Sequence, residues 1–210
     1  TLTGVSLKKV FEQQWQRAAD GTVPARNYLQ LGVSKNVRYT YDVTQPEGSR
    51  ITSLWVDDTL VDPAGSYRVI VPSFLGTGGD NFRAFKEGSL VDTGVVDYEG
   101  FIDYIETSSP ISPDFARRSV QVAGLAASYK KGASASFTLP KLNLTSVGSP
   151  ANTSVSASVK YSDGTVVALG DQTVTNGASG AFTFAVDGAP GPAVITTVAS
   201  PSGTTATIPL

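Results

Sequence analysis

The 210-residue chain contains no cysteine and no histidine, and each absence removes a class of function. Without cysteine the chain can form neither a disulfide framework nor a thiolate metal site, which fits both a cytosolic protein and a bacterial exported one. Histidine is the commonest general base at neutral pH and the commonest ligand for zinc, copper or iron. Its absence argues against a self-contained metallohydrolase and against a Ser-His-Asp enzyme.

Charge of one sign and long apolar runs are also lacking. The formal net charge is −2, and no stretch gathers lysine and arginine side chains. Such a chain lacks the basic surface that attracts a phosphate backbone, so we predict no nucleic-acid partner. Nothing approaches the ~18 consecutive apolar residues of a membrane span, and the N-terminal stretch TLTGVSLKKV lacks the apolar run of a signal peptide. We therefore expect no membrane span.

What the chain does contain is enough apolar material for a core, in two contrasting compositions. Hydrophobic residues make up 40% of the sequence, which suffices for one large domain or two ordinary ones. Residues 1–122 carry 12 basic and 15 acidic side chains, whereas residues 123–210 carry 4 and 3 among many small and β-branched residues. This shift predicts two domains, 1–120 and 121–210.

Residues 1–120 combine helical and strand patterns. The apolar side chains between residues 6 and 20 fall at helical spacing, which predicts an amphipathic helix of about four turns. A second helix is predicted over residues 96–107, with its apolar side chains directed inward. Between the helices, β-rich runs separated by turn-forming stretches predict a mostly antiparallel sheet, so the fold class is α+β. The predicted strands are 27–33, 37–43, 50–58 and 66–74, and the inward side chains are those of Val96, Phe101, Ile102 and Ile105.

Residues 121–210 consist of short β-branched runs bounded by Gly, Pro, Asn or Asp. About seven strands fit, at the spacing of a β-sandwich. We predict an all-β immunoglobulin-like sandwich, as an architecture only, because the core Cys and Trp pattern of antibody domains is missing. Asp163 and Gly164 lie between two strand-like runs, and both tolerate the positive φ of a tight reversal, which predicts a hairpin there.

A glycine-rich loop with aromatic neighbours occupies residues 70–85, IVPSFLGTGGDNFRAF. On pattern alone Phe74 ends an alternating strand and belongs to a core, and Phe82 and Phe85 pack against the sheet. Asp80 by itself is an ordinary turn residue. The GTGG run lacks both the P-loop lysine and the full Rossmann spacing, which argues against a phosphate cradle. The residues alone leave open whether Phe74 closes a core or faces a flat ligand.

Five stretches of the chain together carry a resemblance to a known family. In order they read LTGVSLKKVFEQQW, YLQLGVSKNVRYTYD, DPAGSYRV, PSFLGTGGDNF and DTGVVDYEGFIDYI. In these stretches the chain resembles the C-terminal domain of the 5′-nucleotidase family, which includes bacterial periplasmic UDP-sugar hydrolases and animal ecto-5′-nucleotidase. The resemblance covers residues 1 to about 108, and the region after residue 120 shares none of it.

The resemblance implies that this chain recognises a nucleoside or nucleotide. In the family a base is held between two phenylalanines, and Phe74 stands where one of those rings is found. Asp80 stands where the family places an acid that binds the ribose hydroxyls, and the adjacent glycines let the backbone approach the sugar. A ring stacked on a base contributes ~1–3 kcal/mol with little regard for base identity. The implied substrate-binding residues are Phe74, Gly78, Gly79 and Asp80, with no catalytic and no metal-binding residue.

The chain also departs from the family pattern. The family's second stacking phenylalanine lies in a PFGN-type motif, and its phosphate contacts in an NGGGIR-type motif, both upstream of the segment matched by LTGVSLKK. Neither motif is present, so we expect an N-terminally incomplete domain, a fragment of a larger secreted bacterial enzyme that acts outside the cell or at its surface. The missing partner would be an N-terminal metallophosphoesterase domain with two divalent metal ions. We expect no cofactor in this chain and no phosphatase activity from it alone.

A function of another class stays open at this stage. The chain could instead be a non-catalytic cell-surface or adhesion module, in which the α+β domain and the sandwich together bind a protein or glycan. A carboxylate glycosidase would need two acids facing each other across a groove, and the acids between residues 42 and 114 are scattered through turns without a visible pairing. An exposed Phe74 favours nucleoside recognition, and a buried Phe74 argues against it.

Overall fold

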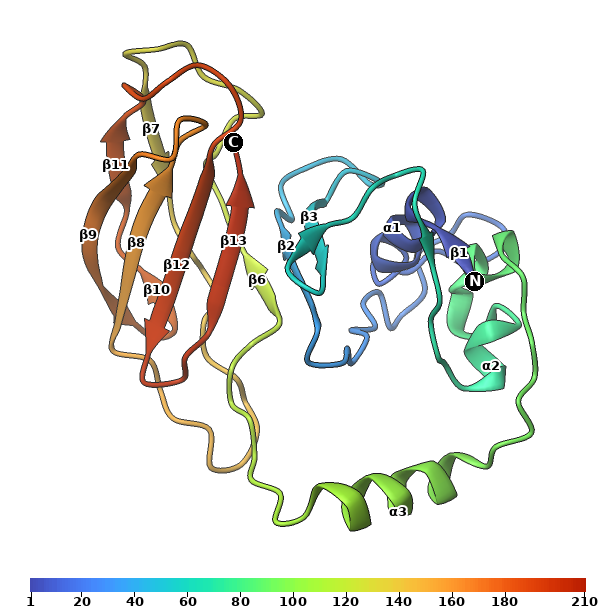
Figure 1. Cartoon of the computed structure of the whole chain (residues 1–210). Coiled ribbons are helices and arrows are strands. Elements are labelled where there is room, and N and C mark those ends of the chain that lie inside the picture. The colour runs from blue at the N-terminus through green and yellow to red at the C-terminus, as the bar shows by residue number, and fades with distance from the viewer. The chain divides into compact units, whose positions relative to one another are not determined.

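The structure, a computed structural model, describes all 210 residues (Figure 1). The chain divides into two compact units. Unit 1 comprises Thr1–Gly32 and Val61–Asp114, and unit 2 comprises Val33–Leu60 and Phe115–Leu210. Each unit is therefore built from two separate segments of the chain. The domain boundary predicted near residue 120 rests on composition, so the division into domains 1–120 and 121–210 stays a prediction.

Unit 1 begins with a short strand that leads directly into a helix. Strand β1 (Leu2–Thr3) pairs antiparallel with β5 (Ser66–Tyr67), and helix α1 spans Gly4–Glu12. The hydroxyl of Thr3 accepts a hydrogen bond from the backbone N–H of Ser6 at 3.2 Å, which caps the helix start. The apolar stripe of α1 then packs into the core of the unit, whose buried apolar residues include Leu2, Leu7, Val10, Phe11, Phe82, Ala84 and Phe85.

Helix α1 is shorter than the helix predicted over residues 6–20. The backbone N–H of Gln13 still bonds to the carbonyl four residues earlier, but those of Gln14 and Trp15 reach only three residues back, so the helix tightens and ends. Trp15 then forms a β-bridge with Tyr28, their ring centroids 5.4 Å apart. The prediction was wrong beyond Glu12, because pairing with a distant segment replaces the next helical turn.

Two predicted strands of unit 1 are also mostly absent. The stretch 27–33 contributes only the bridge at Tyr28, and of 66–74 only Ser66–Tyr67 is paired. Ile70 is 97% exposed, so the alternation of apolar residues there does not mark a buried face. The chain instead turns into the single-turn helix α2 (Ser73–Gly76) immediately after Pro72, whose φ of −53° suits a helix start.

The remaining elements of unit 1 are helical. Two 3₁₀ turns, η1 (Gly79–Asn81) and η2 (Arg83–Glu87), follow α2, and helix α3 spans Asp97–Ser108. The prediction of a helix over 96–107 is confirmed. The prediction that its apolar side chains point inward was wrong, because no residue of α3 is buried. The four side chains are exposed as follows: Val96 43%, Phe101 63%, Ile102 47% and Ile105 38%.

The first sheet of unit 2 has the strand order β4-β3-β2-β6. Its first three strands are antiparallel, as predicted, and β6 joins β2 in parallel. Tyr39 and Tyr41 on β2 are buried, but so are Thr40 and Asp42, so burial here does not follow the alternation of apolar and polar residues in the sequence. The strands are β2 (Val37–Tyr41), β3 (Ile51–Val56), β4 (Thr59–Leu60) and β6 (Ser119–Gln121).

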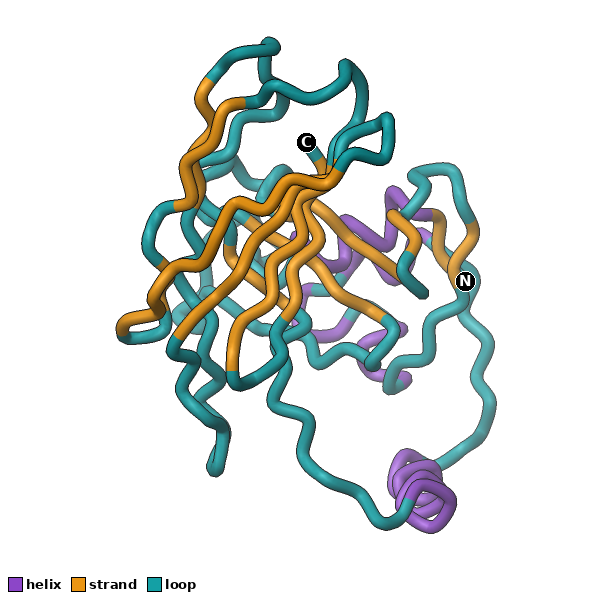
Figure 2. Tube along the Cα trace, turned by 60° about the vertical axis from the view of Figure 1, so that its left-hand side comes forward, coloured by secondary structure: helices purple, strands orange, loops and turns teal.

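Seven further strands, β7 to β13, form an antiparallel sheet of five and a pair of two. The five-stranded sheet has the order β10-β9-β8-β12-β13, and Figure 2 shows its long strands in orange. Residues of both sheets share one apolar cluster, in which the rings of Phe137 and Phe182 stack with centroids 5.0 Å apart. The strands are β7 (Ser134–Phe137), β8 (Ser154–Lys160), β9 (Val166–Thr175), β10 (Ala178–Ser179), β11 (Phe182–Ala185), β12 (Val194–Ser200) and β13 (Thr205–Pro209).

The hairpin predicted at Asp163 and Gly164 is present between β8 and β9, with a different turn. Only Gly164 has positive φ, at 86°, and Asp163 instead accepts a hydrogen bond from the N–H of Thr165 at 2.9 Å. Tyr161 and Thr165 close a three-residue loop. A left-handed residue at the end of such a loop matches the strand twist, so glycine is needed at one position, not two.

Candidate functional site

The four substrate-binding residues implied by the sequence all lie in one loop of unit 1. Helix α2 ends where the hydroxyl of Thr77 donates to the carbonyls of Ser73 and Phe74, at 3.1 and 3.0 Å. The N–H of Gly78 closes the turn on Leu75 at 2.8 Å, and its φ of 86° reverses the chain into η1. Phe74 thus sits on a helical turn and not at the end of a strand.

Phe74 presents its ring at the surface. The residue is 59% exposed, so most of the ring is free for a ligand. Part of the ring lies against the backbone of Gly79, where a Cβ atom would stand 2.5 Å from Cζ of Phe74. Glycine at position 79 therefore gives the aromatic ring its support. Phe82 and Phe85, by contrast, are buried at 2% and 8% exposure, which confirms that they belong to the core.

Asp80 and Asn81 both adopt the left-handed helical conformation, with φ of 48° and 62°. Consecutive non-glycine residues rarely do so, because each costs roughly 1–2 kcal/mol in backbone sterics. Such conformations persist where the surrounding structure fixes them, and they concentrate at ligand sites. Asp80 is itself exposed, and its carboxylate has no hydrogen-bond or ion-pair partner within the chain. It is therefore free to accept hydrogen bonds from a ligand.

Three hydrogen-bonded links tie the segment after Asp80 to the end of α1. In each, a donor on residues 81–84 reaches an acceptor on residues 13–17, a segment distant in sequence. Because the links flank Asp80 on one side, they fix the backbone that carries its carboxylate. The links are Asn81 Nδ2 to Gln16 Oε1 at 2.9 Å, Ala84 N to Gln13 Oε1 at 2.9 Å, and the Arg83 guanidinium to the Arg17 carbonyl at 3.0 and 2.8 Å.

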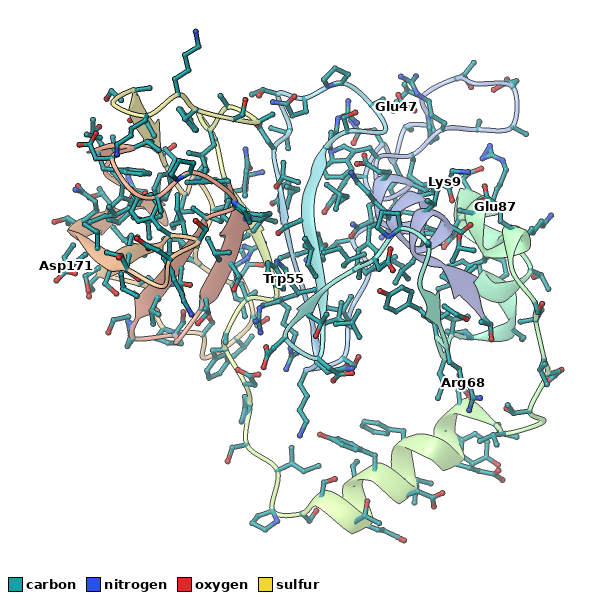
Figure 3. The ribbon with its side chains drawn as sticks, turned by 45° about the horizontal axis from the view of Figure 1, so that its top comes forward. Lys9, Glu47, Trp55, Arg68, Glu87 and Asp171 are labelled. Carbon is teal, nitrogen blue, oxygen red and sulfur yellow. The ribbon has the colours of Figure 1, made fainter.

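Glu87 anchors the other end of η2 to α1. Its carboxylate accepts a hydrogen bond from Ser6 Oγ at 2.7 Å and pairs with Lys9 Nζ at 3.0 Å, as Figure 3 shows for the labelled Lys9 and Glu87. The Ser6 hydrogen bond is the main reason that the pKa of Glu87 lies below its ordinary value. Lys9 lowers this pKa further, and partial burial opposes both.

Lys86 adds a positive charge to the loop. Its aliphatic chain crosses Gly78, so closely that a Cβ atom at residue 78 would stand 2.7 Å from Cε of Lys86. The two glycines thus serve different neighbours: Gly78 makes room for Lys86, and Gly79 makes room for Phe74. Both contacts lie within the protein itself, so the role of the two glycines in binding a sugar stays a prediction.

Together these groups can bind a flat ring that carries hydroxyl groups. The exposed aromatic surface suits stacking, and the partnerless carboxylate suits a pair of hydroxyl donors. The chain holds no cluster of three or more His, Cys, Asp or Glu side chains that could bind a metal ion. A cavity of about 300 Å³ is lined only by unit 2 residues, Tyr129 and Tyr161 among them, and includes none of the four predicted ones.

Sequence reasoning missed the second layer of this site. Gln13 and Gln16 were not singled out, and Asn81 was expected only as an ordinary turn residue, although all three hold the loop. The sequence holds a signal in FEQQWQ, where polar side chains gather just after an apolar helix face. Gln14 and Gln16 are buried, at 0% and 3% exposure, and a buried amide requires hydrogen-bond partners.

Comparison with known proteins supports the resemblance over the first part of the chain. Residues 1–87 match the family model described as 5′-nucleotidase, C-terminal domain. The chain is 31% identical to a snake venom 5′-nucleotidase of Macrovipera lebetinus over 121 residues, 32% identical to an apyrase of Tabanus yao over 126 residues, and 32% identical to the 5′-nucleotidase of Homo sapiens over 123 residues. The predicted resemblance to the C-terminal domain of 5′-nucleotidases is thus supported over residues 1–87.

These alignments cover part of each protein. Each spans 53% of this chain, and they span 28%, 21% and 20% of the venom protein, the apyrase and the human protein. The whole activity of those proteins is therefore not carried over by the match. No helix of the chain is long and apolar enough to cross a membrane.

Proposed function

We propose that this chain supplies the nucleoside-recognition part of a 5′-nucleotidase-type phosphoesterase. The observation that carries the proposal is the exposed ring of Phe74 and the exposed, partnerless carboxylate of Asp80 in one short loop, within the segment that matches the family domain. The base stacks on Phe74, and the vicinal hydroxyls of the ribose donate hydrogen bonds to Asp80. Gly78 and Gly79 shape the loop that carries both groups, because they give room to the Lys86 chain and to the Phe74 ring.

The affinity expected of these groups alone is low. Stacking supplies ~1–3 kcal/mol and a hydrogen bond to a charged group ~1.5–3 kcal/mol, so together they support a dissociation constant of about 1 mM. That affinity suffices to select and orient a substrate that other groups hold more tightly. It does not by itself perform chemistry.

Hydrolysis would require a metallophosphoesterase domain with two divalent metal ions outside these 210 residues. The chain's own side chains do not form a metal site. We therefore derive no catalytic step from them and expect no phosphatase activity from the chain alone. In line with the venom source of three relatives, the parent protein would act outside the cell or at its surface. The strands β7 to β13 would form an immunoglobulin-like sandwich that serves for spacing or attachment.

The test is titration of the full chain with adenosine, followed by NMR chemical shifts. We expect saturable shifts in the loop of residues 74–81 at millimolar adenosine, and their loss in Phe74→Ala. Phe101→Ala is the matched control, because Phe101 is equally exposed at 63% but lies on α3. Binding that survives Phe74→Ala, or that both variants weaken equally, would refute the assignment.

The sugar contact has its own test. Asp80→Asn keeps the size of the side chain and removes the charge, so affinity for adenosine should fall about tenfold. Affinity for 2′,3′-dideoxyadenosine, which offers no hydroxyl pair, should not change. Equal losses for both nucleosides would show that Asp80 does not contact the sugar.

A further inference from the structure

The two left-handed residues of the loop differ in how they are held. Asp80 has no side-chain partner, whereas Asn81 Nδ2 donates to Gln16 Oε1 at 2.9 Å. The strained backbone at Asp80 is thus fixed from outside, through its neighbour. Asn and Asp tolerate this conformation better than other non-glycine residues, but tolerance alone does not select it.

Gln16 is a rigid anchor for this contact. It is 3% exposed, its backbone N–H donates to the Asn27 carbonyl at 2.9 Å, and its Nε2 donates to the Gln13 carbonyl at 2.8 Å. Both its backbone and its amide are therefore fixed before Asn81 is reached. The bond to Asn81 joins segments 65 residues apart in sequence.

We propose that Asn81 and Gln16 are positioning residues for sugar recognition: their hydrogen bond holds Asp80 in the left-handed conformation that aims its carboxylate at the space beside Phe74. This inference rests on the proposed nucleoside binding and adds a specificity device to it. The hydrogen bond between Asn81 and Gln16 affects binding of the hydroxyl pair of the ligand, because Asp80 is the group that it orients. It does not act on stacking, because Phe74 is supported separately by Gly79.

Variants at positions 81 and 16 test whether the hydrogen bond between Asn81 and Gln16, and not the left-handed backbone of residue 81 alone, holds Asp80 in place. Glycine adopts positive φ without steric cost, so Asn81→Gly keeps the backbone path accessible while it removes the side-chain hydrogen bond and loosens the backbone at residue 81. Gln16→Met removes the anchor from the other side with a side chain of similar length. Asn176→Gly is the control, because Asn176 is also left-handed, with φ of 51°, and belongs to unit 2.

The first measurement needs no ligand. The ¹⁵N order parameter of Asp80 should be near the value of about 0.85 for rigid backbone in the wild type and fall below about 0.6 in Asn81→Gly and Gln16→Met. Asn176→Gly should retain the wild-type value. An Asp80 amide that stays rigid in both anchor-deleting variants would overturn the inference, whatever the protein binds.

The second measurement compares two ligands, adenosine and 2′,3′-dideoxyadenosine. Asn81→Gly should weaken adenosine binding about fivefold, the cost of ordering one more residue on binding, and leave dideoxyadenosine binding unchanged. A loss shared equally by both ligands would show a structural role only and overturn the inference. Absence of any binding by the wild type would instead refute the proposed function, while the order parameter still decides whether Asn81 positions Asp80.

Discussion

The ring of Phe74 and the α-carbon of Gly79 are packed so closely that no side chain fits between them. A Cβ atom at Gly79 would lie 2.5 Å from the ring and 2.6 Å from the backbone oxygen of Phe74. The ring could swing aside, but the backbone oxygen belongs to the turn that carries it. The loop and the aromatic ring are therefore a single packed feature.

Gly79→Ala should disturb the packing of the Phe74 ring against the loop. We expect a destabilisation of about 1–3 kcal/mol, typical of overpacking, together with weaker adenosine binding as the ring is displaced. Urea unfolding and NMR titration measure the two effects. Gly32→Ala is the control, because a Cβ there meets no atom within 4 Å and the backbone φ is not positive. An alanine at position 79 as harmless as one at position 32 would show that Phe74 does not rest on this backbone.

Trp55 supports the edge of the large sheet in unit 2. Its indole N–H donates to the carbonyl of Thr207 on β13 at 3.0 Å, and Ser53 Oγ donates to the same oxygen at 3.1 Å. Trp55→Phe keeps an aromatic ring and removes the donor, so stability should fall by about 1 kcal/mol. Chemical denaturation measures the change. Tyr98→Phe, at a residue 60% exposed on α3, should stay within about 0.5 kcal/mol, and a Trp55 effect of that size would contradict the prediction.

The resemblance to a known family assigned four residues of one short stretch to a site, and that assignment stays a prediction, whereas local pattern did not predict the elements that carry them. Phe74, Gly78, Gly79 and Asp80 are nearly contiguous, so a single sequence motif brings them into one loop. The contact of Gln16 with Asn81 joins residues 65 apart and cannot be read from spacing.

The helix predicted over residues 6–20 ends early for the same reason, which is a contact with a segment further along the chain. Trp15 lies at helical spacing from Phe11, yet it pairs with Tyr28, and the buried side chain of Gln14 accepts from the N–H of Leu31 at 2.9 Å. Periodicity reports which face of a segment is apolar. It does not indicate where another segment forms hydrogen bonds with the backbone in place of the next helical turn.

Helix α3 should be the first site of proteolysis. A 12-residue helix with no buried residue is marginal in water, because helices of this length depend on tertiary packing. Chymotrypsin at low ratio should therefore cut after Tyr98, Phe101 or Tyr104, which are 57–63% exposed, well before the buried Phe137 or Phe182. Mass spectrometry identifies the cuts. Resistance of all three sites would mean that another surface covers the apolar stripe of α3 in solution.

The hydrogen bond from Ser6 to Glu87 predicts a pH dependence of stability. Because the pKa of Glu87 is lower in the folded chain than its ordinary 4.5, the unfolded chain takes up the proton first as pH falls. The stabilisation by Glu87 is therefore complete above pH 4.5 and is lost as the pH drops through the lowered folded pKa. Glu87→Gln should be less stable than wild type at pH 7, and the difference should shrink below pH 4.5.

Urea denaturation across pH 3–7 measures this difference. The side chain of Glu87 is 40% exposed and solvent screens its charge, so the effect should be small and weaken further in salt. Glu106→Gln, on the exposed helix α3, should match wild type at every pH. A Glu87→Gln difference that stays constant from pH 7 to pH 3 would show that the contact acts through packing and not through the charge of the carboxylate.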